Sequence, residues 1–206
     1  MSSIQNISIR PLRIDEAKAV YLEHAHRDFP AGELKPFSMI EMLWKQGCYR
    51  AYGFYEDMEG EDGGVKKEKQ KLRAYAFIMA DSAANMLLLD YFAVCGKARG
   101  KGFGTAALGL LKEECMEWDG IIFEVEDDEE DCTEEERQIR KKRIAFYERN
   151  GVVMTDVRSY VFGVAYKLMV LCLGSERAGK RLGEKLASVY RRMLPEAIFE
   201  KEFRLR

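Results

Sequence analysis

The stretch LDYFAVCGKARGKGFGTAAL, residues 89–108, decides the fold of this chain. It begins as an apolar strand, passes through a loop with three alternating glycines, and continues with the apolar spacing of an amphipathic helix. The start of a helix leaves backbone N–H groups free and carries a partial positive charge, and both attract an anion. Glycine lets the backbone approach phosphate oxygens and adopt positive φ. The loop Arg99–Thr105 therefore predicts a pyrophosphate site, with Arg99 and Lys101 adding charge at its rim.

Two other kinds of phosphate loop do not fit this segment. No Gly-Lys-Ser or Gly-Lys-Thr occurs, as a P-loop NTPase would require. The strand does not open the chain, and no acidic residue ends a following strand of a parallel βαβ unit, which argues against a Rossmann domain. A helix-start turn with solvated basic residues is the alternative interpretation of the loop alone.

The composition predicts one folded domain, with or without an appendage. The chain has 206 residues, of which 47% are hydrophobic and 33% charged, and its formal net charge of -2 gives no footprint for nucleic acid. The five cysteines are scattered and form no CxxC pair, so we expect no metal site and no disulfide framework. The longest apolar runs are too short for a membrane span, and no secretory leader is evident. We therefore expect a cytoplasmic protein with no membrane partner.

The remaining sequence predicts an α/β protein with one mixed sheet and helices on its faces. Expected strands are Ile7–Arg10, Cys48–Tyr55, Leu72–Ala80, Asn85–Val94, Ile121–Val125, Val152–Val157 and Tyr160–Leu173. Expected helices run from Asp15 to before Pro30, from an N-cap at Ser38 to Lys45, from Gly104 to about Trp118, and over Glu134–Asn150. The polar segment Asp57–Lys71 is expected to form a solvated hairpin loop or a short disordered insertion.

The end of the chain predicts a helical extension. After the break at Gly174, one apolar face of a last helix, closed by Pro195, is formed by Leu182, Leu186, Val189, Tyr190 and Met193. Such a face would not stay exposed on a monomer, so it would pack on the core or on a partner copy. We expect a main domain over residues 1–173 and the extension over 174–206.

Residues 89–108 resemble the acetyl-CoA-binding segment of the GNAT N-acetyltransferase superfamily. In that segment an apolar strand ending in Ala-Val is followed by four residues and then by Arg-Gly-x-Gly-x-Gly at a helix start. The segment Ile144–Val152 resembles the second family segment, in which a helical Tyr precedes a Gly and an apolar strand. The resemblance covers Ile7 to about Leu173 and implies a GNAT-like acyl-CoA N-acyltransferase fold that uses acetyl-CoA.

The resemblance also implies site residues. The main chain of Phe92–Val94 would contact the pantetheine arm, and N–H groups near Ala93 and Val94 would serve the oxyanion. Tyr147 would lie near the CoA sulfur and protonate the thiolate. The implied cofactor-binding set is Phe92, Ala93, Val94, Arg99, Gly100, Lys101, Gly102, Phe103, Gly104, Thr105 and Tyr147. Arg140 and Arg143 replace the Asn and the small residue of many members, and Val152 replaces the usual Phe. These departures concern contacts to pantetheine and adenine.

The sequence offers two carboxylates, Asp90 and Glu124, as candidates for the general base. Asp90 lies in an otherwise apolar strand, where the family often has a carboxylate, and apolar surroundings raise the pKa of a carboxyl group. A structural partner for a neighbouring strand or loop is the alternative role. Glu124 on the next strand is the other candidate base. His24 and His26 are packing or surface residues, or contact the substrate.

Glu124–Glu136 holds ten acidic residues in thirteen positions. Such a run is a solvated segment that favours the following helix start, or an acidic lip that attracts a cationic amine. The leading interpretation is acetyl transfer from acetyl-CoA to a primary amine of a small molecule or protein, directly in a ternary complex. Two alternatives are a non-catalytic acetyl-CoA-binding sensor or partner module, and an acyltransferase that uses another acyl-CoA. The acceptor is not defined, and monomer and homodimer both stay open.

Overall fold

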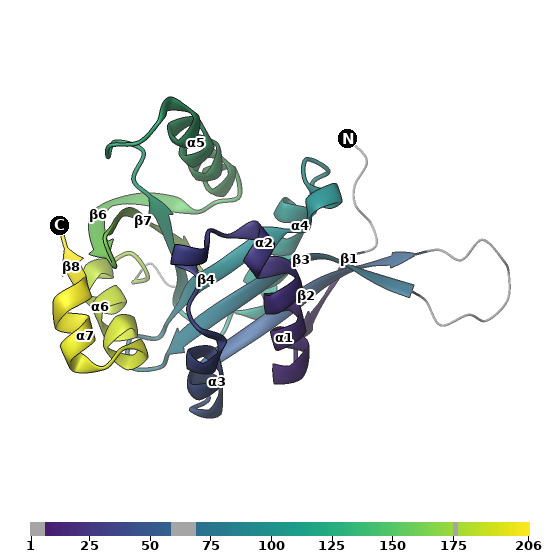
Figure 1. The fold of residues 1–206 in the computed structure, drawn as a ribbon, viewed down its shortest axis with the longest axis horizontal. Helices are drawn as coiled ribbons and strands as arrows, with labels where there is room; N and C mark the ends of the chain where they lie inside the picture. Colours follow the sequence, from purple (N-terminus) through teal and green to yellow (C-terminus); the bar gives the residue numbers. More distant parts are fainter. Residues whose placement is uncertain (1–6, 59–68, 175–176) are drawn as a thin grey trace, which may run out of the picture. The chain divides into compact units, whose positions relative to one another are not determined.

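The computed structural model describes residues 7–58, 69–174 and 177–206. These residues divide into two compact units, one within Met1–Ile78 and Asp90–Glu114, the other within Met79–Leu89 and Cys115–Arg206. Strands β3 and β4 run through both units. Figure 1 labels the helices and strands of each unit.

The first unit combines strands with short helices and the helix that follows the glycine loop. Its strands are β1 (Ile7–Pro11), β2 (Tyr49–Met58) and most of β3 (Lys69–Asp81) and β4 (Met86–Val94). Its helical segments are α1 (Ile14–Val20), η1 (Tyr21–Ala25), α2 (His26–Asp28), η2 (Ala31–Glu33), α3 (Phe37–Lys45), η3 (Gly96–Ala98) and α4 (Phe103–Glu114). β1 and β2 pair antiparallel, with Ile9 opposite Phe54. The core beneath them contains the fully buried Phe54 and Phe77.

The second unit is built on an antiparallel group of strands. Its elements are β5 (Gly120–Glu126), α5 (Glu134–Arg149), β6 (Val153–Val161), β7 (Val164–Cys172), α6 (Leu182–Met193), α7 (Glu196–Glu202) and β8 (Phe203–Leu205). The strand order is β1-β2-β3-β4-β5-β7-β6-β8. Residues Met86–Leu88 of β4 pair parallel with Gly120–Ile122 of β5, and the β5–β7, β7–β6 and β6–β8 pairs are antiparallel. The predicted mixed α/β sheet is confirmed.

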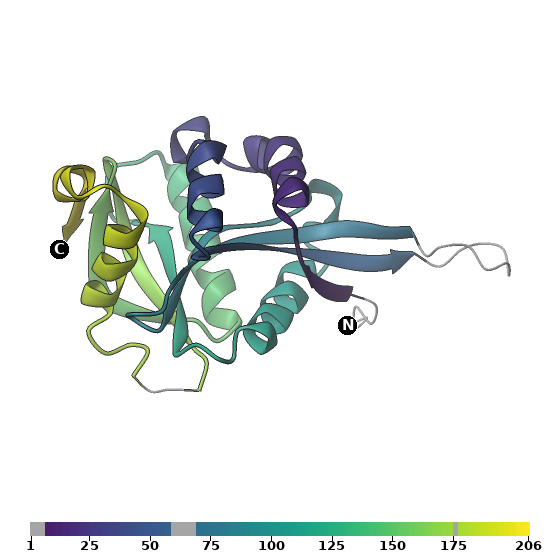
Figure 2. The same cartoon turned by 90° about the horizontal axis from the view of Figure 1, so that it is seen from below.

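Helices α5 and α6 cover opposite faces of the second unit's strands. On β5, the ring of Phe123 contacts Tyr147 of α5, whereas the carboxylate of Glu124 contacts Tyr190 of α6. Consecutive strand residues point to opposite faces, so the two helices lie on either side. Figure 2 shows α6 against this group of strands. The predicted apolar face of α6 is buried, with Leu186 completely so.

The structure corrects the turn between the last two predicted strands. The sequence pattern ends one strand at Val157 and begins the next at Tyr160, but β6 continues through Val161. The hairpin turn lies at Phe162 and Gly163, which have φ values of +48° and +86°. Two consecutive residues at positive φ are typical of a tight hairpin turn whose twist matches the flanking strands.

Other boundaries also differ. Pro36 precedes α3, so the predicted cap at Ser38 is wrong. β2 and β3 extend into both ends of the predicted loop Asp57–Lys71, and its residues 59–68 lie outside the described residues. Pro195 follows α6 as predicted, but it also precedes α7 and β8, which the sequence pattern did not predict. The division at residues 173 and 174 stays a prediction. Within the described ranges, no helix is both long and apolar enough to cross a membrane.

Candidate functional site

The glycine loop follows β4 and leads directly into α4. η3 is followed by a turn in which Gly100 and Gly102 have φ values of +74° and +86°. This left-handed region disfavours residues with a Cβ, so both positions favour glycine. A Cβ built on Gly100 meets no atom within 4 Å, which shows that backbone conformation, not crowding, sets this preference.

The start of α4 is anchored in the first unit and open at its rim. Phe103 is 5% exposed, and the guanidinium carbon of Arg73 lies 5.3 Å from the centre of its ring. The N–H of Ala106 donates to the carbonyl oxygen of Gly102 and closes the first helical turn. Glycine at this point has no side chain that could cap the helix, whereas Lys101 and Thr105 are exposed. This arrangement suits an anion at the helix start.

Arg99, at the rim of the loop, is held by two contacts. Its Nη2 donates to Oδ1 of Asp28 at 2.8 Å, and its Nε donates to the carbonyl oxygen of Val94 at 3.1 Å. The arginine side chain is 59% exposed, but that of Asp28 is only 3% exposed. The sequence pattern places Arg99 at the loop but does not indicate Asp28, which lies 71 positions earlier in the chain.

The last residues of β4 lie beside this loop in the first unit. Phe92, Ala93 and Val94 are each partly buried. The ring of Phe92 packs edge-on against Phe54, with ring centres 6.4 Å apart. The N–H of Cys95 donates to the carbonyl oxygen of Arg73, which ties the end of β4 to β3. Burial and the charge of Asp28 raise the pKa of the Cys95 thiol to about 11.

Asp90 has the contacts of a structural carboxylate. Its side chain is 6% exposed, Oδ1 lies 2.5 Å from Nζ of Lys35, and Oδ2 accepts a hydrogen bond from the hydroxyl of Tyr49. Burial and the nearby Asp90 carboxylate raise the pKa of Tyr49 well above its ordinary value. The ammonium of Lys35 also lies 5.3 Å from the ring centre of Tyr91. The sequence predicted apolar surroundings for Asp90, whereas the structure places the Lys35 ammonium and the Tyr49 hydroxyl against its carboxylate.

The two histidines of the first unit pack against their neighbours. Nδ1 of His24 lies 2.8 Å from Nη2 of Arg27 and 3.9 Å from Sγ of Cys95. The ring of His26 packs edge-on against Tyr21 with centres 5.0 Å apart. These contacts favour the packing role over a substrate role.

Tyr147 lies in the second unit, on α5. It is 8% exposed, and its ring meets that of Phe123 at 4.8 Å and that of Phe146 at 5.3 Å. Burial raises the pKa of Tyr147 to about 12, although the Arg143 charge lowers it in part. The phenol is therefore protonated at neutral pH.

Glu124, also in the second unit, accepts two hydroxyl hydrogen bonds. Ser159 Oγ donates at 2.8 Å and the Tyr190 hydroxyl at 2.6 Å. Tyr190 comes from the C-terminal extension. The sequence pattern places Tyr190 on the apolar face of the last helix but does not indicate this polar contact.

Most of the acidic run is paired with basic side chains. Of its ten carboxylates, six form ion pairs: Glu126 with Arg140 and Arg143, Asp127 with Arg158 and Lys167, Asp128 with Lys167, Glu129 with Arg158 and Lys167, Glu130 with Arg206, and Glu134 with Arg137. Lys167, whose side chain is 12% exposed, lies within 3.4 Å of three carboxylates. Part of the run is thus a local network of ion pairs.

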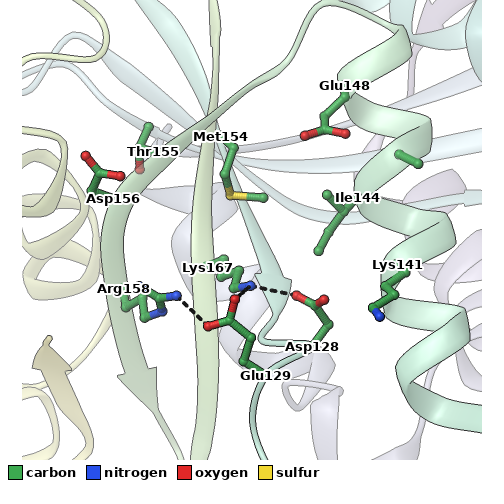
Figure 3. A pocket seen from close by; sticks show the side chains of 11 residues that line it. Asp128, Glu129, Lys141, Ile144, Glu148, Met154, Thr155, Asp156, Arg158 and Lys167 are labelled. Atoms are coloured by element: carbon green, nitrogen blue, oxygen red, sulfur yellow. Dashed lines mark hydrogen bonds and ion pairs between the residues drawn. The ribbon is translucent and has the colours of Figure 1, made fainter. Parts of the chain in front are cut away.

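A hollow of about 360 Å³ lies beside this network in the second unit. It is lined by residues of α5, β6, β7 and the loop after β5. Figure 3 shows Lys167 and Arg158 directed at Asp128 and Glu129, so these basic and acidic groups face one another. Asp128 and Glu129 of the acidic run line the hollow, but none of the predicted catalytic or cofactor-binding residues does. Among the described residues, no group of three or more His, Cys, Asp or Glu side chains is placed to hold a metal ion.

Comparison with known proteins identifies the fold. No family profile and no curated protein matches the sequence. A protein from Bacteroides thetaiotaomicron assigned to the GNAT acetyltransferase family is 17% identical, with a TM-score of 0.60 over 87% of this chain and 94% of that one. The ribosomal-protein-S18-alanine N-acetyltransferase of Escherichia coli is 19% identical, with a TM-score of 0.53 over 85% of this chain and 97% of that one.

A third solved structure carries ligands. The spermidine N-acetyltransferase of Vibrio cholerae, in complex with CoA and spermine, is 12% identical, with a TM-score of 0.56 over 82% of this chain and 97% of that one. Taken together, these likenesses show that the chain has the GNAT fold. The family resemblance of residues 89–108 and Ile144–Val152 is confirmed at that level.

Proposed function

We propose that this chain, which has the fold of the GNAT superfamily, is an acetyl-CoA-dependent N-acetyltransferase. It transfers the acetyl group to a primary amine of a small molecule or protein, directly within a ternary complex. The observation that carries the proposal is the loop between β4 and α4, where Gly100 and Gly102 adopt positive φ immediately before a helix start. A fold alone does not define a function, and this loop supplies the specific chemistry.

The loop residues fit a pyrophosphate. Its N–H groups from Gly100 to Thr105 are at or next to a helix start, where negative charge is stabilised. Arg99 and Lys101 add positive charge, and the planar guanidinium suits phosphate oxygens. In this assignment the main chain of Phe92–Val94 contacts the pantetheine arm and its N–H groups stabilise the oxyanion. The bound cofactor supplies a thioester that carries the acetyl group.

Tyr147 is proposed as the proton donor. The amine nitrogen forms a bond to the acetyl carbon, the C–S bond breaks, and the departing thiolate takes a proton. A buried phenol whose pKa is about 12 holds its proton at neutral pH; it would pass that proton to the thiolate as the C–S bond breaks and regain one from the N–H that the new amide nitrogen loses.

Two carboxylates are proposals for the group that takes the proton of the acceptor ammonium. Asp90 would act while in contact with Lys35 and Tyr49, and Glu124 while accepting from Ser159 and Tyr190. Asp90→Asn and Glu124→Gln separate them. The variant that lacks the base should lose the acidic limb of the pH profile of kcat/KM, whereas the other should retain it.

The deciding experiment measures thiol release from acetyl-CoA with a panel of primary amines. The panel should include peptide α-amines and polyamines, because the Escherichia coli and Vibrio cholerae relatives are named for acceptors of these kinds. Amine-dependent thiol release supports an acetyltransferase. CoA binding without release for any amine would support a binding module, and release from other acyl-CoAs alone would support a different acyltransferase.

Tyr147→Phe tests the assigned chemistry. We expect a fall in kcat of roughly 100-fold with acetyl-CoA affinity nearly unchanged, because only the transition state uses the hydroxyl. Tyr160→Phe, the same change on β6, is the matched control and should leave kcat near that of the wild type. Weakened acetyl-CoA binding with unchanged turnover would instead assign Tyr147 a packing role.

A further inference from the structure

The first helical segment contains a turn of unusual geometry. α1 continues directly into η1 (Tyr21–Ala25), which is π-helical, and then into the last turn, α2. A π-helical turn holds one more residue than an α-helical turn. Because each residue advances an α-helix by about 100° around its axis, the extra residue rotates every later side chain by about that angle. Asp28, the last residue of α2, therefore points in a direction that an uninterrupted α-helix would not give it.

The side chain of Asp28 is buried, and both of its carboxylate oxygens accept hydrogen bonds. Oδ1 accepts from Nη2 of Arg99 at 2.8 Å, and Oδ2 accepts from the hydroxyl of Tyr75 at 3.1 Å. Burying a carboxylate is costly unless it is paired and hydrogen-bonded, and these contacts meet both conditions. The position of Asp28 is therefore well defined, and it defines that of Arg99.

Arg99 has donors to spare. A guanidinium group carries five N–H bonds, and Asp28 and the Val94 carbonyl use two of them within the described part of the chain. Two anchors fix both the plane and the direction of the group, while the side chain remains 59% exposed beside the glycine loop. A guanidinium that is already oriented loses less rotamer freedom when it binds an anion.

We propose that Asp28 is a positioning residue for the cofactor: through the π-helical turn it holds Arg99 in the orientation that binds a phosphate oxygen of acyl-CoA. This inference rests on the proposed function. Asp28 does not touch the ligand, since its oxygens are occupied by Arg99 and Tyr75. Removing it leaves the positive charge of Arg99 in place but releases its orientation.

The test compares a ligand that has the pyrophosphate with one that lacks it. Asp28→Asn should weaken CoA binding about tenfold by calorimetry, equivalent to about 1.4 kcal/mol. KM for acetyl-CoA should rise in parallel while kcat stays near the wild-type value. The kinetic constants for S-acetylpantetheine, which has no pyrophosphate, should not change. Asp15→Asn, which removes an exposed partner of Arg13 from the same helical segment, is the matched control and should bind CoA normally.

A double-mutant cycle makes the assignment specific. Arg99→Gln changes an exposed residue and should by itself weaken CoA binding. Asp28→Asn should then add nothing in the Arg99→Gln background. Deleting Leu22, which is 55% exposed in η1, should convert the π turn to an α turn and reproduce the effect of Asp28→Asn.

The outcomes separate this inference from the proposed function. If Arg99→Gln weakens CoA binding but Asp28→Asn does not, Asp28 has no positioning role. If Asp28→Asn binds CoA more tightly, the carboxylate competes with phosphate for Arg99 and the inference is overturned. Equal losses for acetyl-CoA and S-acetylpantetheine would show general structural damage, which also overturns it. CoA binding that is unaffected by Arg99→Gln or by any loop variant would instead contradict the pyrophosphate assignment itself.

Discussion

Two strand–loop–helix segments of this chain share a plan but differ in what occupies the helix start. β4 leads through residues 95–102 into α4, and β5 leads through residues 127–133 into α5. The first loop is basic and ends in glycine. The second is acidic and ends in Thr133, whose Oγ1 accepts from the N–H of Glu136 at 3.2 Å, while Glu136 accepts from the N–H of Thr133 at 2.8 Å.

In the proposed assignment, this difference leaves the start of α4 available to a ligand, whereas the start of α5 is capped by the chain's own side chains. The capping box at α5 satisfies backbone N–H groups with the chain's own oxygens and places carboxylates where an anion would bind. At α4, Gly102 has no side chain that could accept hydrogen bonds from the free N–H groups. Its φ of +86° lies in the left-handed region that glycine adopts readily. The charges follow the same division, because the acidic residues of the second loop largely meet basic residues of the same unit.

The largest expected effect comes from making the first loop resemble the second. Gly102→Asp adds a negative charge and a Cβ at positive φ. We expect CoA affinity to fall by roughly 100-fold or more, measured by calorimetry. Gly109→Asp adds the same charge further along α4, where a Cβ meets no atom within 4 Å, and should bind CoA nearly normally. Unchanged affinity in a folded Gly102→Asp protein would reject the loop assignment.

The second prediction concerns the ion pairs of the acidic loop. Burial by itself raises the pKa of Asp127, but the N–H of Glu129 and the charges of Arg158 and Lys167 lower it below its ordinary value of 3.8. A depressed pKa stabilises the folded state above about pH 4, and this contribution is lost as the pH falls through the folded-state value. Asp127→Asn should reduce the free energy of unfolding at pH 7 by about 2 kcal/mol.

The pH dependence of unfolding checks that sign. In urea unfolding from pH 6 to pH 3, the difference between wild type and Asp127→Asn should stay constant down to about pH 4 and shrink below it, because the carboxylate of the unfolded chain then takes up a proton more readily than the folded one, whose pKa is lower. Asp131→Asn changes an exposed carboxylate of the same run and serves as the control, with little effect at either pH. A constant difference across this range would mean that the ion pairs of Asp127 do not contribute.

The third prediction compares the same substitution at two threonines, one at the start of each helix. Thr133→Ala removes the cap of α5 and should lower the free energy of unfolding by about 1 kcal/mol, with CoA affinity unchanged. Thr105→Ala, in the first turn of α4, should have the reverse pattern, with a small loss of CoA affinity and unchanged stability. Both are measured by thermal unfolding and calorimetry. Equal losses of stability in the two variants would show that the two threonines have the same structural role at their helix starts.

The two segments also differ in how far the sequence could predict them. The strand, glycine turn and helix start of residues 89–108 follow from local periodicity and glycine conformation, and the structure agrees within two residues, although α4 ends at Glu114, before the predicted helical positions Cys115 and Trp118. Asp28 pairs with Arg99 across 71 positions, and Tyr190 with Glu124 across 66, so no local pattern predicts either contact. β8 was missed because three residues are too few for alternation to be recognised, and its strand conformation depends on pairing with β6.

The smallest expected effect is the salt dependence of the acceptor. Exposed charges are screened over about 8 Å at physiological ionic strength, so an acidic lip that attracts a cationic amine would give a KM that rises with salt. Because six of the ten carboxylates in the run already pair with basic residues, their field at a distance is largely cancelled. We expect KM for a cationic acceptor to change by less than about twofold from 50 mM to 300 mM salt. Neutralising the exposed Asp131 and Glu135 together should have a similarly small effect, with kcat unchanged. A steep rise of KM with salt that this double variant abolishes would show that the run attracts the acceptor after all.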